Sequence, residues 1–376
     1  MNAYIPDIYE QFHCLADKCP TICCKGWVLP VDEDTLKLYE ELPGIEGRHV
    51  RFHIQKKEPV SIRRQFGRCP FLNCDKMCQF QVNGTPELMP VVCRTYPREG
   101  VRYDKEARVV FSLSCPAVAN LFMEHLGRRE YVKTDRPLEF FWSIDNEDDA
   151  FMAFLKRDEE KLLDFLWQED KDLSEIWPAM YAYLYQENDR IIRDQLERTD
   201  EVELTFDKEK HGEYVLLRDP TYSFLKIKTI DHMVLDHITY SSLSVKEPKF
   251  FHLIRRYADI FGRQYLDKVD DYFDTQMRQM MEECPEAKLK FKSYFSWTLQ
   301  EIFPLSFEYY SVLRQFLFAV LYTQLYMIFD LVDYMEKGKN RSMDRQAEVL
   351  YTIEQGIRHN PRLNQNLMNV IRDEFL

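Results

Sequence analysis

The chain of 376 residues is 45% hydrophobic and 14% aromatic, which excludes intrinsic disorder and leaves room for about two domains. Its net charge of -13 is uneven, because residues 1–118 hold 16 Lys and Arg against 15 Asp and Glu, while the remainder holds 34 against 48. An acidic second part argues against a nucleic-acid partner and would tolerate or attract a basic protein. The simpler explanation, that acidity keeps the domain in solution, stays open.

The first residues, MNAYIPDIYEQ, have neither the basic start nor the apolar stretch of a signal peptide. The most apolar segment, residues 316–329, is too short to span a bilayer and includes Thr323 and Gln324. We therefore expect a buried helix there, no membrane partner, and a cytoplasmic protein whose thiols stay reduced.

The first third of the chain predicts short elements separated by turns. Residues 31–42 carry acidic residues ahead of spaced leucines, which predicts one short helix. Residues 101–103 and 108–114 predict a hairpin whose second strand has Val109, Phe111 and Leu113 on one face. Cys115 would then lie at the end of that strand and point back at the other thiols.

Beyond residue 118, apolar residues recur at spacings of three and four, which predicts a mostly helical region. The expected helices are residues 117–126, 148–170, 173–198 with an interruption at Pro178, 249–262, 264–284, 307–335, 343–359 and 363–375. Residues 202–244 are the least clear, and strands there stay open. The predicted fold is mainly α, with a small, irregular, Cys-rich metal-binding module and its short β-hairpin in residues 1–118, followed by a larger acidic helical domain in residues 119–376.

Nine of the ten cysteines lie in residues 14–115, and three of them fall within six positions in CPTICC, residues 19–24. Adjacent cysteines rarely bridge to each other, and disulfides are rare in the cytosol, so this density predicts metal ligation. Which four of the thiols bind, and whether there are one or two centres, stays open. The candidate ligands are Cys14, Cys19, Cys23, Cys24, Cys69, Cys78, Cys93 and Cys115.

Thiolates are soft ligands, suited to zinc, copper(I) or an iron–sulfur cluster. The chain has no Cys-x2-Cys, the usual pair in zinc sites, whereas proline follows Cys19, Cys69 and Cys115, a habit of cluster-binding cysteines. Apolar neighbours such as Phe71 and Met77 would keep water away from a cluster. The pattern therefore favours a [4Fe–4S] cluster, with zinc as the alternative and reduced core cysteines as a third interpretation.

Residues 12–27 follow the pattern F-x-C-x4-C-x3-CC-x-GW, which resembles the opening of the flagellin lysine-N-methylase family. CPFLNCDKMCQFQ, LMPVVCRTYPR and SLSCP then resemble that family's succeeding motifs in the same order, so the likeness covers residues 12–116. A shorter set of these cysteines resembles the small zinc- or iron-chelating domains. The resemblance implies an iron–sulfur centre and S-adenosylmethionine-dependent methylation of exposed lysines on a protein substrate, flagellin in that family. Cys74 is outside the pattern and is expected to be a bystander.

The sequence indicates neither a pocket for S-adenosylmethionine nor catalytic residues. It has no G-x-G-x-x-G after a strand, and Gln81 stands where the third cysteine of a radical-enzyme motif beginning at Cys74 and Cys78 would be. Methyl transfer to a lysine needs groups that desolvate the amine and accept its proton. One helical face offers such groups, although an ordinary core-and-rim helix explains it equally well: Tyr322, Tyr326, Asp330 and Asp333.

Several other residues have both a functional and a structural interpretation. Arg94 and Arg98 flank Cys93 and are expected to neutralise an anionic cluster or to bind a carboxylate. His49 and His53 are expected to be exposed rather than metal ligands. The remaining candidates are expected to be structural or to cover the centre: Asp231-His232, Asp236-His237, and Gly26 with Trp27. The alternative function is a non-catalytic metal-binding module whose acidic helical domain binds a partner, with electron transfer or redox sensing as a third.

Overall fold

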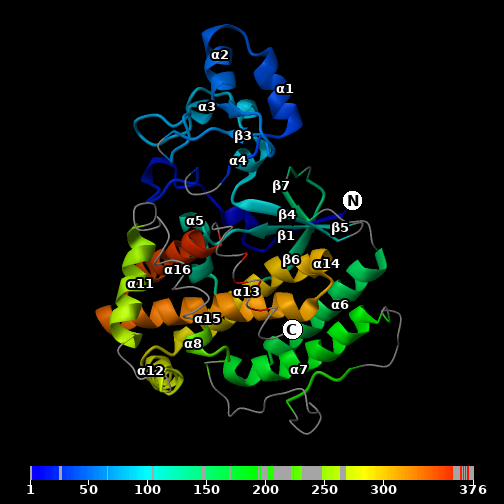
Figure 1. Cartoon of the computed structure of the whole chain (residues 1–376), viewed down its shortest axis with the longest axis vertical. Helices are drawn as coiled ribbons and strands as arrows, with labels where there is room; N and C mark the ends of the chain where they lie inside the picture. The colour runs from blue at the N-terminus through cyan, green and yellow to red at the C-terminus, as the bar shows by residue number, and fades with distance from the viewer. Residues whose placement is uncertain are drawn as a thin grey trace.

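The computed structural model describes residues 2–24, 28–65, 67–103, 106–136, 138–139, 141–144, 149–168, 171–193, 195, 202–206, 222, 224–230, 248–262 and 268–358, with single positions 365, 367, 369 and 371 near the end. These residues form two lobes (Figure 1). The upper lobe consists of short elements, and the lower lobe of long helices that cover a β-sheet.

The upper lobe contains short helices and a two-stranded sheet: α1 (Glu33–Glu41), α2 (Gly44–Phe52), β2 (Ile54–Gln55), β3 (Ser61–Ile62), α3 (Gln79–Val82) and α4 (Val91–Thr95). Helix α1 begins after Asp32 because the carboxylate of Asp32 accepts a hydrogen bond from the backbone N–H of Thr35 at 2.9 Å. The predicted helix over residues 31–42 is thereby confirmed. This lobe has its own hydrophobic core, which includes Tyr39, Phe71 and Phe80.

A five-stranded mixed sheet lies below this lobe, in the order β6-β1-β5-β4-β7. Its strands are β1 (Asn2–Pro6), β4 (Arg98–Tyr103), β5 (Glu106–Phe111), β6 (Tyr131–Thr134) and β7 (Phe141–Ile144). The predicted hairpin is confirmed as β4 and β5, which run antiparallel, while β1 runs parallel to β5. Val109, Phe111 and Leu113 were expected on one face of this strand, but Val109 packs into a different hydrophobic cluster from Phe111 and Leu113, and the strand ends at Phe111.

The lower lobe is organised around helix α15 (Val312–Lys337), which packs against six other α-helices in the described part of the chain. Ser311 caps its start by accepting a hydrogen bond from the backbone N–H of Arg314, and Gly338, at φ 75°, ends it in a conformation that favours glycine. The helices around it are α5 (Pro116–Glu124), α6 (Asp149–Leu166), α7 (Leu173–Ile192), α8 (Ile227–Ile230), α11 (Pro248–Phe261), α12 (Val269–Glu283), α13 (Glu286–Ile302), α14 (Ser306–Tyr309) and α16 (Met343–Ile357). Those that pack against α15 are α7, α11, α12, α13, α14 and α16.

The mainly helical prediction is confirmed, with corrections at several bounds. Helix α7 continues through Pro178, because the burial of Trp177 and its neighbours outweighs one lost backbone hydrogen bond. The helix expected from residue 307 begins at Val312, because Tyr310 has a positive φ of 50° that separates α14 from α15. Residues 202–206 form no strand and residues 227–230 are helical. Most of residues 202–244 and 363–375 lies outside the described residues.

Several elements were not predicted, among them α2, α13, β1, β6 and β7. Helix α13 is buried almost all round, including Lys290, Ser293 and Gln300, so its sequence has no one-sided apolar period. Strand β1 is held by long-range pairing, with Tyr4 opposite Arg108, which a local pattern cannot indicate. The irregular module of the prediction is therefore partly an ordered sheet.

The domain boundary after residue 118 stays a prediction. The main hydrophobic core joins residues from both sides of it, for example Val101 and Phe111 of the sheet with Trp297 of α13. The indole N–H of Trp297 donates to the backbone carbonyl of Phe111 at 3.0 Å. The core of the upper lobe, by contrast, is made of residues 29–89.

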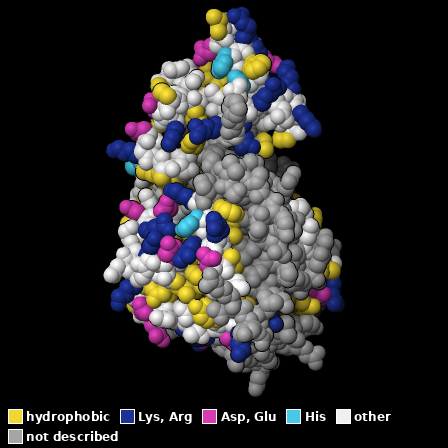
Figure 2. All heavy atoms as spheres, turned by 60° about the vertical axis from the view of Figure 1, so that its left-hand side comes forward, with side chains coloured by type: hydrophobic (Ala, Val, Ile, Leu, Met, Phe, Trp, Pro, Cys, Tyr) yellow, Lys and Arg dark blue, Asp and Glu magenta, His cyan; other side chains and the backbone are white. Residues whose placement is uncertain are grey.

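Among the described residues, α15 is the one helix that is long and apolar enough to cross a membrane, and its most apolar stretch is fully buried against the other helices. The expectation of a buried helix over residues 316–329 is confirmed, although the helix is longer than that stretch. Charged side chains of both signs are interspersed over the face that includes α11 (Figure 2), so the acidic balance of the chain forms no single-sign patch on the described part of that face.

Candidate metal centre

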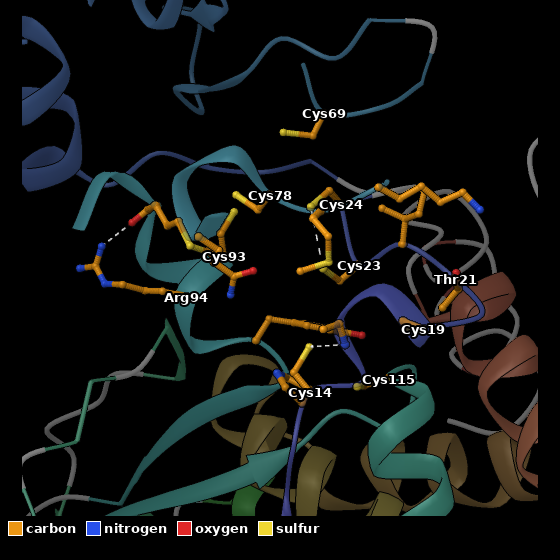
Figure 3. A pocket seen from close by; sticks show the side chains of 18 of the residues that line it. Cys14, Cys19, Thr21, Cys23, Cys24, Cys69, Cys78, Cys93, Arg94 and Cys115 are labelled. Atoms are coloured by element: carbon orange, nitrogen blue, oxygen red, sulfur yellow. Dashed lines mark hydrogen bonds between the residues drawn. The ribbon is translucent and has the colours of Figure 1, made fainter. Parts of the chain in front are cut away.

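Eight cysteines line one cavity of about 460 Å³ where the two lobes meet (Figure 3). They are the eight that the sequence motifs single out, and they come from residues 14–24, 69–78, 93 and 115. Cys74 is exposed and Cys284 is buried at the end of α12, and neither lines the cavity. All ten cysteines are free thiols. The structure thus gathers the predicted set and leaves out the two cysteines that the motifs exclude.

Ordered elements position several of these thiols. Cys78 is the residue before α3 and Cys115 is the residue before α5, so each lies at the N-terminus of a helix. Cys93 lies within α4, which is tied to α1 because the carboxylate of Asp32 also accepts from the backbone N–H of Val91 at 2.7 Å. A second tie is the hydroxyl of Tyr39, which donates to the carbonyl of Leu88 at 2.6 Å.

The thiols fall into two groups by their nearest sulfur neighbours. The upper thiols influence one another electrostatically, and all but the exposed Cys23 lie in or against the core of the upper lobe. They are Cys23, Cys24, Cys69, Cys78 and Cys93. The lower thiols are Cys14, Cys19 and Cys115, which influence one another electrostatically. Cys115 lies at the start of α5, and Cys19 lies beside Thr21 on the side that faces α16 (Figure 3). Cys23 of the upper group contributes to raising the pKa of Cys19 in the lower group, so the two groups adjoin.

Cys24 links two upper thiols through hydrogen bonds. Its sulfur lies 3.8 Å from that of Cys23, and it is also hydrogen-bonded to Cys69. The hydrogen bond from Cys24 lowers the pKa of Cys23 to about 7 and lowers that of Cys69, while the pKa of Cys24 is raised because it keeps the shared proton. Two thiolates bound about 2.3 Å from one tetrahedral metal would lie about 3.8 Å apart, so the separation of this adjacent pair suits joint ligation of one zinc ion. A [4Fe–4S] cluster takes one thiolate on each iron, so it would use one of the pair or require the two sulfurs to move apart.

Burial and neighbouring thiols keep most of the other cysteines protonated. Burial raises the pKa of Cys93, with further contributions from Cys69, Cys23 and Cys78. Burial also raises the pKa of Cys115 to about 12. A cation bound among these sulfurs would remove the cost of ionising them, which is why metal binding to thiols releases protons.

Backbone N–H groups directed at the sulfurs act in the opposite sense and favour thiolates. The backbone N–H of Ala16 donates to Cys14 at 3.4 Å. Backbone groups of Phe80 and Gln81 oppose the effect of burial on the pKa of Cys78, and those of Ala117 and Val118 do so for Cys115. Such N–H donors at helix N-termini suit thiolate ligands of a metal or cluster. The donor set and its surroundings therefore fit a thiolate-bound centre.

The thiols surround the cavity without meeting at one point. Within the part of the chain that the structure describes, no three His, Cys, Asp or Glu side chains converge closely enough to hold a metal ion as they stand. The metal centre therefore stays a prediction, and binding would have to draw the sulfurs together.

The two predicted arginines differ in their partners. Arg94 lines the cavity, but its Nε donates to the carboxylate of Glu139 at 2.7 Å and its guanidinium forms a second bond to the same carboxylate. Arg98 also lines the cavity and has no acidic partner among the described residues. Arg94 is thus neutralised within the protein, whereas Arg98 is not.

The histidine prediction is half wrong. His49 is exposed as expected, but His53 is only 3% exposed. His53 is buried because it packs against Phe71, at 6.0 Å between ring centroids, and against His49, at 4.8 Å. Neither histidine lines the cavity. The other candidates lie outside the described residues: Gly26, Trp27, Asp231, His232, Asp236 and His237.

The helical face with paired tyrosines and aspartates is buried in the lower lobe, as the core interpretation expects: Tyr322, Tyr326, Asp330 and Asp333. The two oxygens of Asp330 lie 2.7 Å from Lys290 Nζ and 2.7 Å from Arg341 Nη1. Asp333 accepts from Arg345 at 2.6 Å. These aspartates are occupied by ion pairs that join α13, α15 and α16.

Tyr96 and Gln355 are among the residues of the cavity wall that sequence reasoning missed. The hydroxyls of Tyr96 and Ser114 are 2.9 Å apart. Gln355 on α16 donates to the carbonyl of Ser114 at 2.8 Å and accepts from Thr21 at 3.5 Å. Gln355 lies 241 residues from Ser114, and no local pattern signals such a contact. Helix α16 is therefore part of the cavity wall.

Comparison with known proteins finds relatives for about a third of the chain. Over 123 residues it is 28% identical to the flagellar biosynthetic protein FliU of Salmonella muenchen, covering 31% of this chain and 73% of that protein. Over 123 residues it is also 29% identical to the lysine-N-methylases of Salmonella typhimurium and Salmonella choleraesuis. Those matches cover 31% of this chain and 31% of each methylase. No family model and no solved structure matches the chain.

Proposed function

We propose that the protein is an S-adenosylmethionine-dependent protein-lysine N-methyltransferase with a metal centre in the cysteine cavity, a [4Fe–4S] cluster in preference to zinc. The observation that carries this proposal is that eight motif cysteines, up to 101 positions apart in sequence, line one cavity. The support for the activity is the partial similarity to two lysine-N-methylases. The similarity to FliU, named as a flagellar biosynthetic protein, supports a flagellin-related substrate.

The upper thiols are the proposed ligands. They offer the four thiolates that a zinc ion or a cluster needs, with one to spare. When bound, such a centre would join segments that are distant in sequence and, if it is a cluster, supply a site for one electron. The protein's own contribution is the set of backbone N–H groups that favour thiolates and the apolar walls that exclude water, which include Phe71 and Phe80.

The methylation step places its own demands on the site. The lone pair of a neutral lysine amine forms the new N–C bond while the C–S bond of the sulfonium breaks, and the amine then loses a proton. S-adenosylhomocysteine is the other product. Because only the neutral amine has a lone pair to donate, the rate should rise with pH until the lysine is deprotonated.

The direct test is methyl transfer to purified bacterial flagellin by anaerobically prepared protein with isotope-labelled S-adenosylmethionine. The proposal predicts labelled lysines by mass spectrometry, and much less label with a Cys24→Ser variant than with Cys284→Ser, whose cysteine lies away from the cavity. A protein that contains metal but neither binds S-adenosylmethionine nor transfers methyl groups would support the alternative, a non-catalytic metal-binding module that binds a protein partner.

A further inference from the structure

Arg98 is placed in the cysteine cavity in an unusual way. It is the first residue of β4, opposite Phe111, and its side chain lines the cavity. Its guanidinium carbon lies 4.9 Å from the ring centroid of Phe12 and 5.3 Å from that of Tyr9. Contacts of this kind with two aromatic rings fix the plane and direction of the guanidinium.

The hydrogen-bonding capacity of Arg98 is not satisfied within the described part of the chain. Its Nε is buried and has no hydrogen-bond partner there. A buried donor without a partner costs free energy, so this atom is expected to find one in a water, an ion or a ligand. The free edge of a guanidinium offers two parallel N–H groups, which match the two oxygens of a carboxylate.

Among the described residues, a second arginine and a lysine also border the cavity, and neither offers the same chemistry. Arg94 is bound through two nitrogens to Glu139 and is therefore already paired. Lys76 is exposed at the rim and has no planar fork of donors. Arg98 is consequently the cation best suited to bind an anionic group inside the cavity.

The cavity has the dimensions and lining of a small-molecule site. A volume of about 460 Å³ lies within the usual range for pockets that bind such ligands. Its wall includes apolar side chains, among them Leu15, Ile22 and Leu72, beside the single unpaired guanidinium. Apolar walls of this kind can contact a ring or alkyl portion of a ligand, and the fixed cation favours a ligand that carries a carboxylate.

We propose that Arg98 binds the carboxylate of a small molecule that enters the cysteine cavity. This inference rests on the proposed function for the identity of that molecule, which is then S-adenosylmethionine. The methionine carboxylate pairs with the Nε edge of Arg98, and the rest of the molecule lies along the apolar wall beside the thiols. The cofactor pocket is thereby assigned to the meeting point of the two lobes, and a separate pocket among the long helices is not required.

The test compares two ligands on metal-replete, anaerobically purified protein by calorimetry: S-adenosylmethionine and decarboxylated S-adenosylmethionine, which lacks only the carboxylate. Wild type should bind the first about 10- to 100-fold more tightly, the range for a charge-assisted pair. Arg98→Gln should bind both ligands with equal, weak affinity. Arg98→Lys, which keeps the charge but loses the fork, should give an intermediate preference.

Arg94→Gln is the matched control, because it also removes a cavity arginine, and it should keep the wild-type preference for S-adenosylmethionine. Metal content is measured for each variant. The inference is overturned if Arg98→Gln retains the preference for the carboxylate, or if it loses metal in parallel with affinity, since Arg98 would then serve the centre. Wild type that binds neither ligand would overturn the proposed cofactor, and this inference with it.

Discussion

Asp32 provides the clearest test of how the cavity is held together. Its carboxylate accepts three hydrogen bonds, from Thr35 N and Thr35 Oγ1 at 2.9 Å each and from Val91 N at 2.7 Å. Loss of an N-cap costs about 1 kcal/mol, and a charge-assisted bond to Val91 adds about 1 kcal/mol after allowance for partial exposure. Asp32→Ala should therefore destabilise the α1–α4 contact, and with it the position of Cys93, by about 2 kcal/mol.

The assay is hydrogen–deuterium exchange of peptides that cover α1 and α4, because it measures local opening. Asp32→Ala should speed exchange roughly 30-fold at neutral pH, whereas Asp32→Asn, which keeps a capping oxygen, should speed it only about fivefold. Asp34→Ala is the control, since Asp34 is exposed in the first turn of the same helix. Equal exchange in wild type and Asp32→Ala would refute the assignment.

The pH dependence of this contact has a definite sign. Burial favours a higher pKa for Asp32, but the hydrogen bonds from Val91 and Thr35 outweigh it and hold that pKa below its usual value. The stabilisation is therefore complete above the unfolded pKa of about 4 and is lost as the pH falls through the folded pKa. Below about pH 4, exchange in wild type should approach that of the Asp32 variants.

Two further predictions concern the packing of the lower lobe. Asp330→Asn should lower the free energy of unfolding by about 3–5 kcal/mol in urea denaturation, because Lys290 and Arg341 would remain buried without their shared charge partner. A loss below about 1 kcal/mol would contradict a structural role for these ion pairs. Gly356→Ala should cost about 1–3 kcal/mol by the same assay, since a Cβ there would lie 2.3 Å from Phe250 Cδ1; unchanged stability would mean that α11 and α16 are not in contact at this point.

More of the candidate site than of the surrounding fold could be predicted from the sequence. Closely spaced thiols that stay reduced are most often metal ligands, so eight cysteines could be singled out from the sequence. All eight line the cavity. Arg98 was identified because it flanks a motif cysteine. What sequence did not reveal is that Arg94 has an internal partner, Glu139, which lies 45 positions away.

The elements that sequence missed share a physical cause. Helix α13 is buried on nearly all sides and includes Lys290 paired to Asp330, so its polar residues obscure the apolar period on which helix prediction depends. Strands β1, β6 and β7 are short and owe their structure to partners distant in the chain. Gln355 reaches the cavity wall from α16 for the same reason: tertiary contacts decide its role.

Metal analysis of anaerobically purified protein tests the central claim most directly. The chain should contain about four irons with matching sulfide if the cavity holds one [4Fe–4S] cluster, or stoichiometric zinc if it holds the alternative. Serine should lower that content at four or more of the five upper thiols, whereas Cys74→Ser and Cys284→Ser should leave it unchanged, because neither residue lines the cavity. Protein without stoichiometric metal, or equal loss of metal from the Cys74 variant, would contradict a metal centre in the cysteine cavity.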